Sequence, residues 1–143
     1  VMLFGVVFGL YIQPDAAMHP HLKPGDLLLF YRLPRSCTAG EVVVFTKDGQ
    51  RRTGRVAARG GDTVEVTDAA ALVINGSTVA EPDIYEKTPK YDSNVTYPLT
   101  LADGEYFILC DARAGARDSR WFGPVQAGEI QGRVIAVLRR NGI

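Results

Sequence analysis

Short apolar runs alternate with turn-forming residues along most of this chain. The apolar run Leu27–Tyr31 has the length of a strand, and residues 41–46 are β-branched and aromatic, as is typical of strands. Asp48-Gly49 predicts a hairpin turn, after which residues 51–58 return as the second strand. Residues 63–67 alternate with period two, which indicates a half-buried strand.

The same pattern continues in the second half of the chain. Residues 71–74 and 77–79 flank Asn75-Gly76, two residue types that tolerate the positive φ of a type I′ turn, so we predict a second hairpin. Further strands are predicted at 84–87, 99–101, 105–110 and 134–138, with residues 111–124 as loop. No window shows helical periodicity. The sequence therefore predicts a mainly β domain, an antiparallel sheet or a barrel-like arrangement.

Residues 1–12 contain no charged side chain and allow two interpretations. They could be an apolar first strand, or the end of a transmembrane helix, which needs roughly 20 residues in full. We favour the membrane interpretation, mainly because of the motifs that follow this segment, and Tyr11 would then lie at the membrane interface. Residues 13–143 are expected to form the β domain, with 62–106 as a hairpin-containing excursion within it.

Composition and residue spacing argue against two classes of function, nucleic-acid binding and metal binding. The 143 residues carry 16 basic and 16 acidic side chains, and no basic stripe with interleaved aromatics appears, so nucleic-acid binding is not expected. Cys37 and Cys110 lack metal-site spacing, and a disulfide and two free thiols both remain open. His19 and His21 lack a third ligand nearby, so we expect no metal and no other cofactor.

Residues 15–26 carry the first motif that points to chemistry. They read Asp-Ala-Ala-Met-His-Pro-His-Leu-Lys-Pro-Gly-Asp. This resembles the nucleophile box of type I signal peptidases, the S26 serine peptidases, which reads Ser-Met-x-Pro and then Gly-Asp. The matching residues are Met18, Pro20, Gly25 and Asp26, whereas Ala17 stands where that family has its nucleophilic serine.

Two further segments resemble boxes of the same family, in the same order. Residues 54–62 resemble Lys-Arg-Val followed by Gly-Asp, with Arg55 and Asp62 kept and Gly54 in place of the lysine. Residues 110–120 resemble Gly-Asp-Asn-Arg, two residues, Ser, one residue and Asp-Ser-Arg. This box keeps Asp111, Arg113, Asp118, Ser119 and Arg120, and has Ala116 in place of the inner serine. The resemblance covers residues 14–140.

The resemblance implies a role for each substituted position. Ala17 would replace the nucleophile, Gly54 the general base, Ala116 the serine that orients the base, and Asp15 the side chain that stabilises the oxyanion. None of these side chains can perform the corresponding step. The retained Asp and Arg residues are expected to pair with one another and to support the loop rather than react.

The same resemblance suggests a function. Among signal peptidase-like proteins, the chain resembles the catalytically inactive ones that assist assembly of sortase-dependent pili in Gram-positive bacteria. That implies a single-pass membrane protein with its domain outside the cytoplasm, acting as a non-proteolytic chaperone. Its partner would be an extended segment of a secreted or pilin polypeptide, bound at the edge of residues 14–18 or 51–56. The alternative is a functional signal peptidase with substituted active-site residues.

Overall fold

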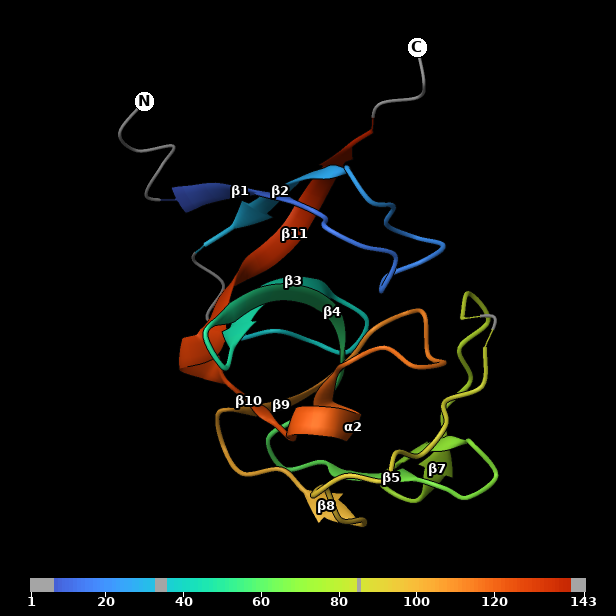
Figure 1. The fold of residues 1–143 in the computed structure, drawn as a ribbon. Helices are drawn as coiled ribbons and strands as arrows, with labels where there is room; N and C mark the ends of the chain where they lie inside the picture. The colour runs from blue at the N-terminus through green and yellow to red at the C-terminus, as the bar shows by residue number, and fades with distance from the viewer. Residues whose placement is uncertain (1–6, 33–35, 85, 140–143) are drawn as a thin grey trace.

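The computed structural model describes residues 7–32, 36–84 and 86–139, which form two sheets (Figure 1). All strand pairs in these residues are antiparallel, which confirms the predicted fold class. The larger sheet contains, in spatial order, β1 (Phe8–Ile12), β2 (Leu27–Tyr31), β11 (Ile130–Leu138), β3 (Val42–Lys47), β4 (Gln50–Arg59), β9 (Glu105–Leu109) and β10 (Val125–Gln126). The smaller sheet contains β7 (Ser77–Thr78), β6 (Leu72–Ile74), β5 (Thr63–Val66) and β8 (Leu99–Thr100).

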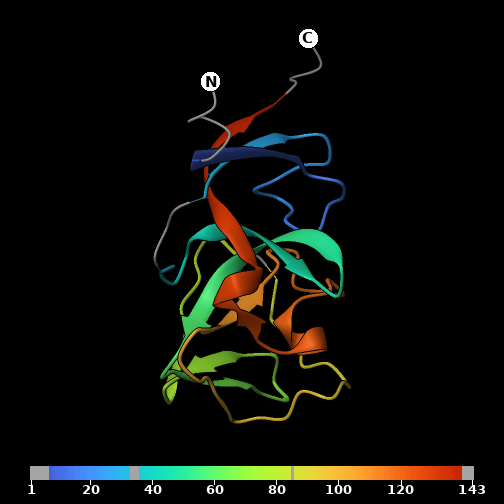
Figure 2. The same cartoon turned by 90° about the vertical axis from the view of Figure 1, so that its left-hand side faces the viewer.

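The two sheets lie at opposite ends of the molecule, as two perpendicular views agree (Figures 1 and 2). β9 joins them, because its alternate side chains enter two different cores. Tyr106 and Ile108 pack with Val43 and Phe45 inside the large sheet. Phe107 and Leu109 pack in a second cluster with residues of the small sheet. A strand buried on both faces reads as an unbroken apolar run, as residues 105–110 do.

The predicted hairpin turns are present. Asp48 and Gly49, between β3 and β4, have φ values of 54° and 75°. Asn75 and Gly76, between β6 and β7, have φ values of 52° and 82°. Both turns place two consecutive residues at positive φ, as a type I′ turn requires.

The apolar N-terminal segment is a strand where the structure describes it. Phe8–Ile12 form β1, which pairs with β2 from Phe8↔Tyr31 to Ile12↔Leu27. The membrane interpretation that we favoured therefore does not hold for these five residues, and residues 1–6 lie outside the described part. Within the described ranges, no helix has the length and apolar character needed to cross a bilayer.

Other differences from the predicted elements have local causes. The predicted strand 84–87 is wrong for Ile84, Glu86 and Lys87, which lie in no strand, while Tyr85 lies outside the described residues. The predicted loop 111–124 contains a one-turn helix, α2 (Ser119–Phe122), and η1 (Ala127–Glu129) follows β10. A single turn is too short to show helical periodicity in the sequence. β11 starts at Ile130, four residues before its predicted start, and irregular pairing with β2 and β3 obscures the alternation.

The ion pair between Asp26 and Arg139, just after β11, should make the stability of the domain depend on pH. Asp26 is buried, and its carboxylate accepts hydrogen bonds from Lys23 N–H at 2.8 Å and from Nε and Nη2 of Arg139. The bonds from Arg139 hold the pKa of Asp26 below its ordinary value. The stabilisation is therefore complete above the unfolded pKa and is lost as the pH falls through the folded pKa. We expect Arg139→Gln to lower the free energy of unfolding at pH 7 and to approach the wild type as the carboxylate is protonated.

Urea unfolding of both proteins at pH 7, 5 and 3 measures this difference. Arg59→Gln removes a charge from an exposed arginine of β4 and serves as the control. An Arg139→Gln deficit that stays constant down to pH 3 would contradict the role of the pair.

Candidate functional site

The fold brings the three motif segments together around Asp111. Arg55 donates from Nε and Nη2 to the two oxygens of Asp111 at 2.9 and 2.7 Å, and the carboxylate is buried. The Asp111 N–H contacts Met18 Sδ at 3.3 Å, and the adjacent Ala112 N–H donates to Ala17 O at 2.9 Å. His21 Nδ1 lies 2.8 Å from Asp111 Oδ2. The Asp111 carboxylate and the adjoining backbone N–H groups thus hold together distant segments of the chain, such as those of Met18 and Asp111, which are 93 positions apart.

A cleft opens beside Ala17, between the end of β1, the first half of β4 and the loop before α2. The lining residues are Tyr11, Gln13, Pro14, Asp15, Ala17, Gln50, Arg51, Arg52, Thr53, Cys110 and Arg117. This lining contains neither serine nor lysine. Its aliphatic hydroxyl, on Thr53, is buried and donates to Gln13 Oε1 at 2.7 Å. Ala17 and Ala116 both pack against the core cluster that contains Met18.

The edge of β4 that faces this cleft is shorter than expected. Arg51 and Thr53 pair with β3 on one side, while β9 on the other side ends at Leu109, opposite Arg55. The carbonyl of Arg51 instead accepts from Tyr11 Oη at 3.0 Å, and that of Thr53 contacts Cys110 Sγ at 3.7 Å. The expected open edge over 51–56 is thus wrong beyond Gly54, because Arg55 has strand neighbours on both sides. Val56 pairs with β9 on one side and bonds to Gly40 and Glu41 on the other.

Asp15 engages the backbone of Ala17. Its Oδ1 accepts the Ala17 N–H at 3.0 Å, the two-residue pattern of an Asx turn, and also lies 3.3 Å from Gln13 Nε2. An N–H in this bond is not available to a second acceptor. A carboxylate beside it also repels any oxygen that develops negative charge there. The site therefore combines an occupied donor with an unfavourable charge.

Gly54 does not face the cleft. Side chains alternate along a strand, so residue 54 points to the opposite face of β4 from Thr53. A Cβ at residue 54 would lie 2.3 Å from Ile108 Cγ2 and 3.3 Å from Phe45 Cε1. The space that a side chain would need is filled by the core.

This close packing predicts the effect of the smallest possible side chain. Gly54→Ala should lower the free energy of unfolding by about 1–3 kcal/mol, because the added methyl overpacks the core. In an Ile108→Ala background the clash is removed, so the same change should cost much less. Chemical denaturation measures both. Gly128→Ala is the matched control, since a Cβ there meets nothing within 4 Å. An equal cost of Gly54→Ala in both backgrounds would show that Ile108 is not the obstacle.

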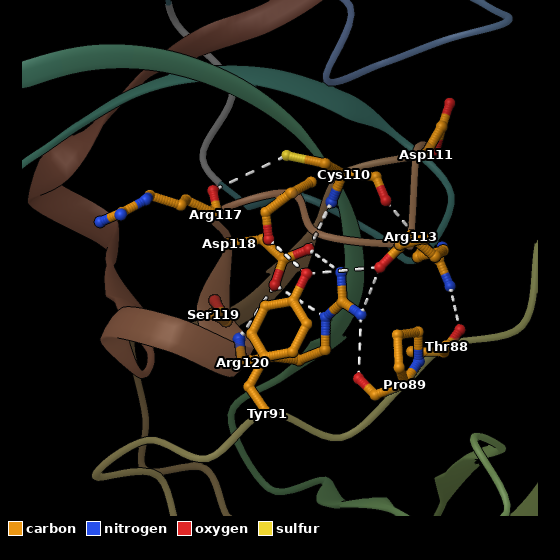
Figure 3. A network of polar contacts seen from close by, with 12 residues as sticks. Thr88, Pro89, Tyr91, Cys110, Asp111, Arg113, Arg117, Asp118, Ser119 and Arg120 are labelled. Atoms are coloured by element: carbon orange, nitrogen blue, oxygen red, sulfur yellow. Dashed lines mark hydrogen bonds and ion pairs between the residues drawn. The ribbon is translucent and has the colours of Figure 1, made fainter.

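The charged residues of the third motif form a buried network (Figure 3). Arg120, with no exposed surface, donates from Nε and Nη2 to Asp118 Oδ1 and Oδ2 at 2.9 and 2.7 Å. Asp118 also accepts the N–H of Cys110 at 3.0 Å and that of Arg120 at 3.1 Å, which caps α2. The Ser119 hydroxyl accepts from Ile108 N–H at 2.9 Å. The expected pairing of these arginines with carboxylates is present.

A second buried arginine ties this loop to the excursion. Arg113 donates to both oxygens of Glu81 at 2.8 and 2.9 Å and to Thr88 Oγ1 at 2.8 Å. The Tyr91 hydroxyl donates to Ala116 O at 2.6 Å, and its ring lies over Arg120 with Cζ 4.2 Å from the centroid. Sequence reasoning missed these three excursion residues, because no motif or periodicity marks them.

The other expected site residues have structural positions. Gly25 adopts a φ of 90° in the turn before β2. Asp62 accepts Arg59 N–H at 3.1 Å and Asn75 Nδ2 at 2.9 Å, so it fixes the turn between β4 and β5 rather than the cleft. Pro20 lies in the turn that follows Met18.

Neither cysteine supplies a reactive thiolate to the described site. Cys37 and Cys110 are free and buried, and burial raises the pKa of both thiols, so the Cys110 thiol in the cleft wall stays protonated. No group of three potential metal ligands occurs among residues 7–32, 36–84 and 86–139.

Comparison with known proteins agrees with this motif geometry. Residues 1–139 match the family described as signal peptidase, peptidase S26. The chain belongs to this family. It is 29% identical to signal peptidase I V of Bacillus subtilis (strain 168), over 92% of this chain and 86% of that protein. It is 30% identical to a signal peptidase I of Bacillus caldolyticus, over 90% of this chain and 78% of that protein.

A solved structure of the signal peptidase family supports the same fold. The crystal structure of a signal peptidase I from Enterococcus faecalis V583 matches with a TM-score of 0.59 at 28% identity. The match covers 73% of this chain and all of that one. The mainly antiparallel β architecture is therefore the signal peptidase fold.

Proposed function

We propose that this chain is a signal peptidase-like protein that binds an extended polypeptide segment and does not cut it. In this proposal, Ala17 stands at the nucleophile position, Gly54 at that of the general base, and Ala116 at that of the base-orienting serine. Asp15 stands at the position of the oxyanion-stabilising side chain. The observation that carries the proposal is the hydrogen bond from Ala17 N–H to Asp15 Oδ1, because it occupies a donor that an acyl-transfer reaction needs.

The expected loss of rate is large. Enzymes without their nucleophile and base retain about 10³–10⁴-fold acceleration over water, which comes from the oxyanion hole and from substrate binding. Loss of one oxyanion donor costs a further factor of about 10²–10³. Little acceleration remains once both losses are combined.

The cleft itself is small, about 40 Å³, so a peptide would bind along its β4 edge rather than inside it. Arg51–Thr53 have a strand neighbour on the β3 side alone, so an extended segment can add to their other edge once it replaces the contacts of Tyr11 Oη and Cys110 Sγ with the carbonyls of Arg51 and Thr53. Residues 14–18 form the opposite wall as a turn rather than a strand. The side chains that line the cleft then determine which peptide sequence binds most tightly.

The resemblance of the motifs suggests the biological setting. We propose a single-pass membrane protein with this domain outside the cytoplasm, acting as a chaperone for pilins during sortase-dependent pilus assembly. Deletion of the gene should then shorten or abolish pilus polymers. Complementation with the wild-type chain, but not with a variant carrying Ala17→Trp in the cleft wall, should restore them.

A direct assay separates binding from cutting. The purified chain is mixed with a signal-peptide substrate that has small residues at its cleavage site, and products are followed by mass spectrometry. We expect intact substrate after prolonged incubation. Reproducible cleavage that is lost when one residue of this chain is changed would overturn the proposal.

The second candidate is a signal peptidase that cuts with substituted residues. It is favoured by the names of the relatives, which are signal peptidases I. Thr53 carries the aliphatic hydroxyl of the cleft lining, so cleavage abolished by Thr53→Val would support this candidate.

A further inference from the structure

Three arginines line the cleft without an acidic partner. Arg51, Arg52 and Arg117 form no ion pair with any residue in the described part of the chain. The carboxylate of the lining belongs to Asp15, which accepts from Ala17 N–H. Other arginines of the domain do pair with carboxylates, as Arg55 does with Asp111 through Nε and Nη2. Arg51 and Arg117 therefore outweigh the single carboxylate of the cleft lining, and Arg52 adds a further positive charge on the opposite face of β4.

Aromatic rings and neutral groups hold these arginines in place. The Cζ atoms of Arg51, Arg52 and Arg117 lie 5.6, 5.5 and 4.9 Å from the ring centroids of Tyr11, Phe122 and Trp121 respectively. A guanidinium stacked on a ring keeps the N–H groups at its edge free for an acceptor. Figure 3 shows the Arg117 side chain pointing away from the buried carboxylate network.

Their existing hydrogen bonds leave donors unused. Arg51 Nε donates to Gln131 Oε1 at 2.6 Å, and Arg52 Nη2 donates to Gln50 Oε1 at 3.1 Å. Arg52 Nε is buried and has no hydrogen-bond partner. Each guanidinium has five N–H donors, so it can donate to carboxylate oxygens without breaking these bonds.

We propose that the cleft selects an acidic peptide segment, an inference that rests on the proposed peptide-binding function. Arg51 and Arg52 are neighbours on β4 and point to opposite faces of the strand. The side chains of an added strand alternate in the same way. Consecutive acidic residues of the bound segment, such as Glu-Asp, would therefore meet one arginine on each face. A segment of small neutral residues would leave these charges unmatched.

Paired peptides provide the test. We would titrate the purified chain with a fluorescent, extended octapeptide that contains Glu-Asp at its centre and with its Gln-Asn counterpart. We expect about tenfold or greater preference for the acidic peptide at low salt, and a smaller preference at 300 mM NaCl, because screening weakens charge pairing. Arg51→Gln and Arg52→Gln should each weaken acidic binding severalfold and reduce the preference for the acidic peptide over its Gln-Asn counterpart.

Control variants make each outcome decisive. Arg59→Gln removes the same charge from an exposed position at the far end of β4 and should bind the acidic peptide as the wild type does. Arg52→Lys keeps the charge and tests the fork geometry, and circular dichroism checks the fold of every variant. Equal binding of the two peptides would overturn the acidic selection and leave the proposed function standing. Binding of neither peptide would overturn both, and so would arginine-dependent binding to phosphatidylglycerol vesicles in place of peptides.

Discussion

Ala17→Ser combined with Gly54→Lys is expected to leave the chain without measurable peptidase activity. The two changes return a hydroxyl and an amine to the sequence, but two obstacles in the structure remain. Asp15 Oδ1 still accepts the N–H of residue 17 at 3.0 Å, so the oxyanion of an acyl intermediate would face a carboxylate. Ile108 still fills the space beside Gly54, so the new lysine would have to displace the core.

Removing these obstacles should release activity in steps. Adding Asp15→Ser to the double variant frees the N–H and supplies a second donor, which should raise kcat by about 10²–10³ once the base is placed. Adding Ile108→Ala removes the clash on the core face of β4, from which the lysine would still have to turn toward residue 17, and Ala116→Ser adds a hydroxyl on the side of residue 17. The five-fold variant should therefore cut a signal-peptide substrate measurably faster than the double variant.

A fluorogenic substrate with small residues at the cleavage site measures each step. Asp15→Asn in place of Asp15→Ser is the matched control, since the amide removes the charge and can still accept the Ala17-position N–H. A cleavage rate for Asp15→Asn between those of Asp15 and Asp15→Ser would show that the negative charge and the occupied N–H each slow the reaction. If the double variant alone cut as fast as the five-fold variant, neither Asp15 nor Ile108 would be an obstacle.

Local sequence patterns predicted most of the β fold. The strands at 27–31, 42–47 and 105–109 follow from apolar and β-branched runs, and the Asp48-Gly49 and Asn75-Gly76 turns follow from residue types that accept positive φ. Arg55 and Asp111 were expected in the site because they belong to recognised motifs. The structure adds that they bind each other directly.

Features that depend on register and on distant residues were not predictable. The direction in which residue 54 points, and its contact with Ile108, depend on the pairing of β4 with β9, which shifts between Val56 and Ala58. Glu81 lies 32 positions from Arg113 in a segment without periodicity, so only the folded chain reveals their pairing. Arg51 and Arg52 belong to no motif, and Arg117 fills a position that the third motif leaves unspecified. Their lack of acidic partners becomes evident only in the folded structure.

Arg120→Ala is expected to lower the free energy of unfolding by about 3–5 kcal/mol, because it leaves a buried charge unpaired. Asp118 and Arg120 both have 0% exposed side-chain surface, so water cannot replace the lost partner. Stability of a domain is typically about 5–15 kcal/mol, so this is a large share of it. Arg120→Met retains much of the side-chain volume and should cost nearly as much, which separates the charge from the packing.

The surface pair between Arg133 and Glu41 is the control for this experiment. Its side chains are 39% and 22% exposed, so Arg133→Ala should cost no more than about 1 kcal/mol. Trp121, the single tryptophan, adjoins Arg120 and reports urea unfolding by fluorescence. A loss below 1 kcal/mol for both Arg120 variants would contradict a stabilising network. A large loss of stability should also weaken peptide binding. Asp118 accepts the N–H of Cys110, and two residues later the N–H of Ala112 donates to Ala17 O, so the network supports the cleft wall.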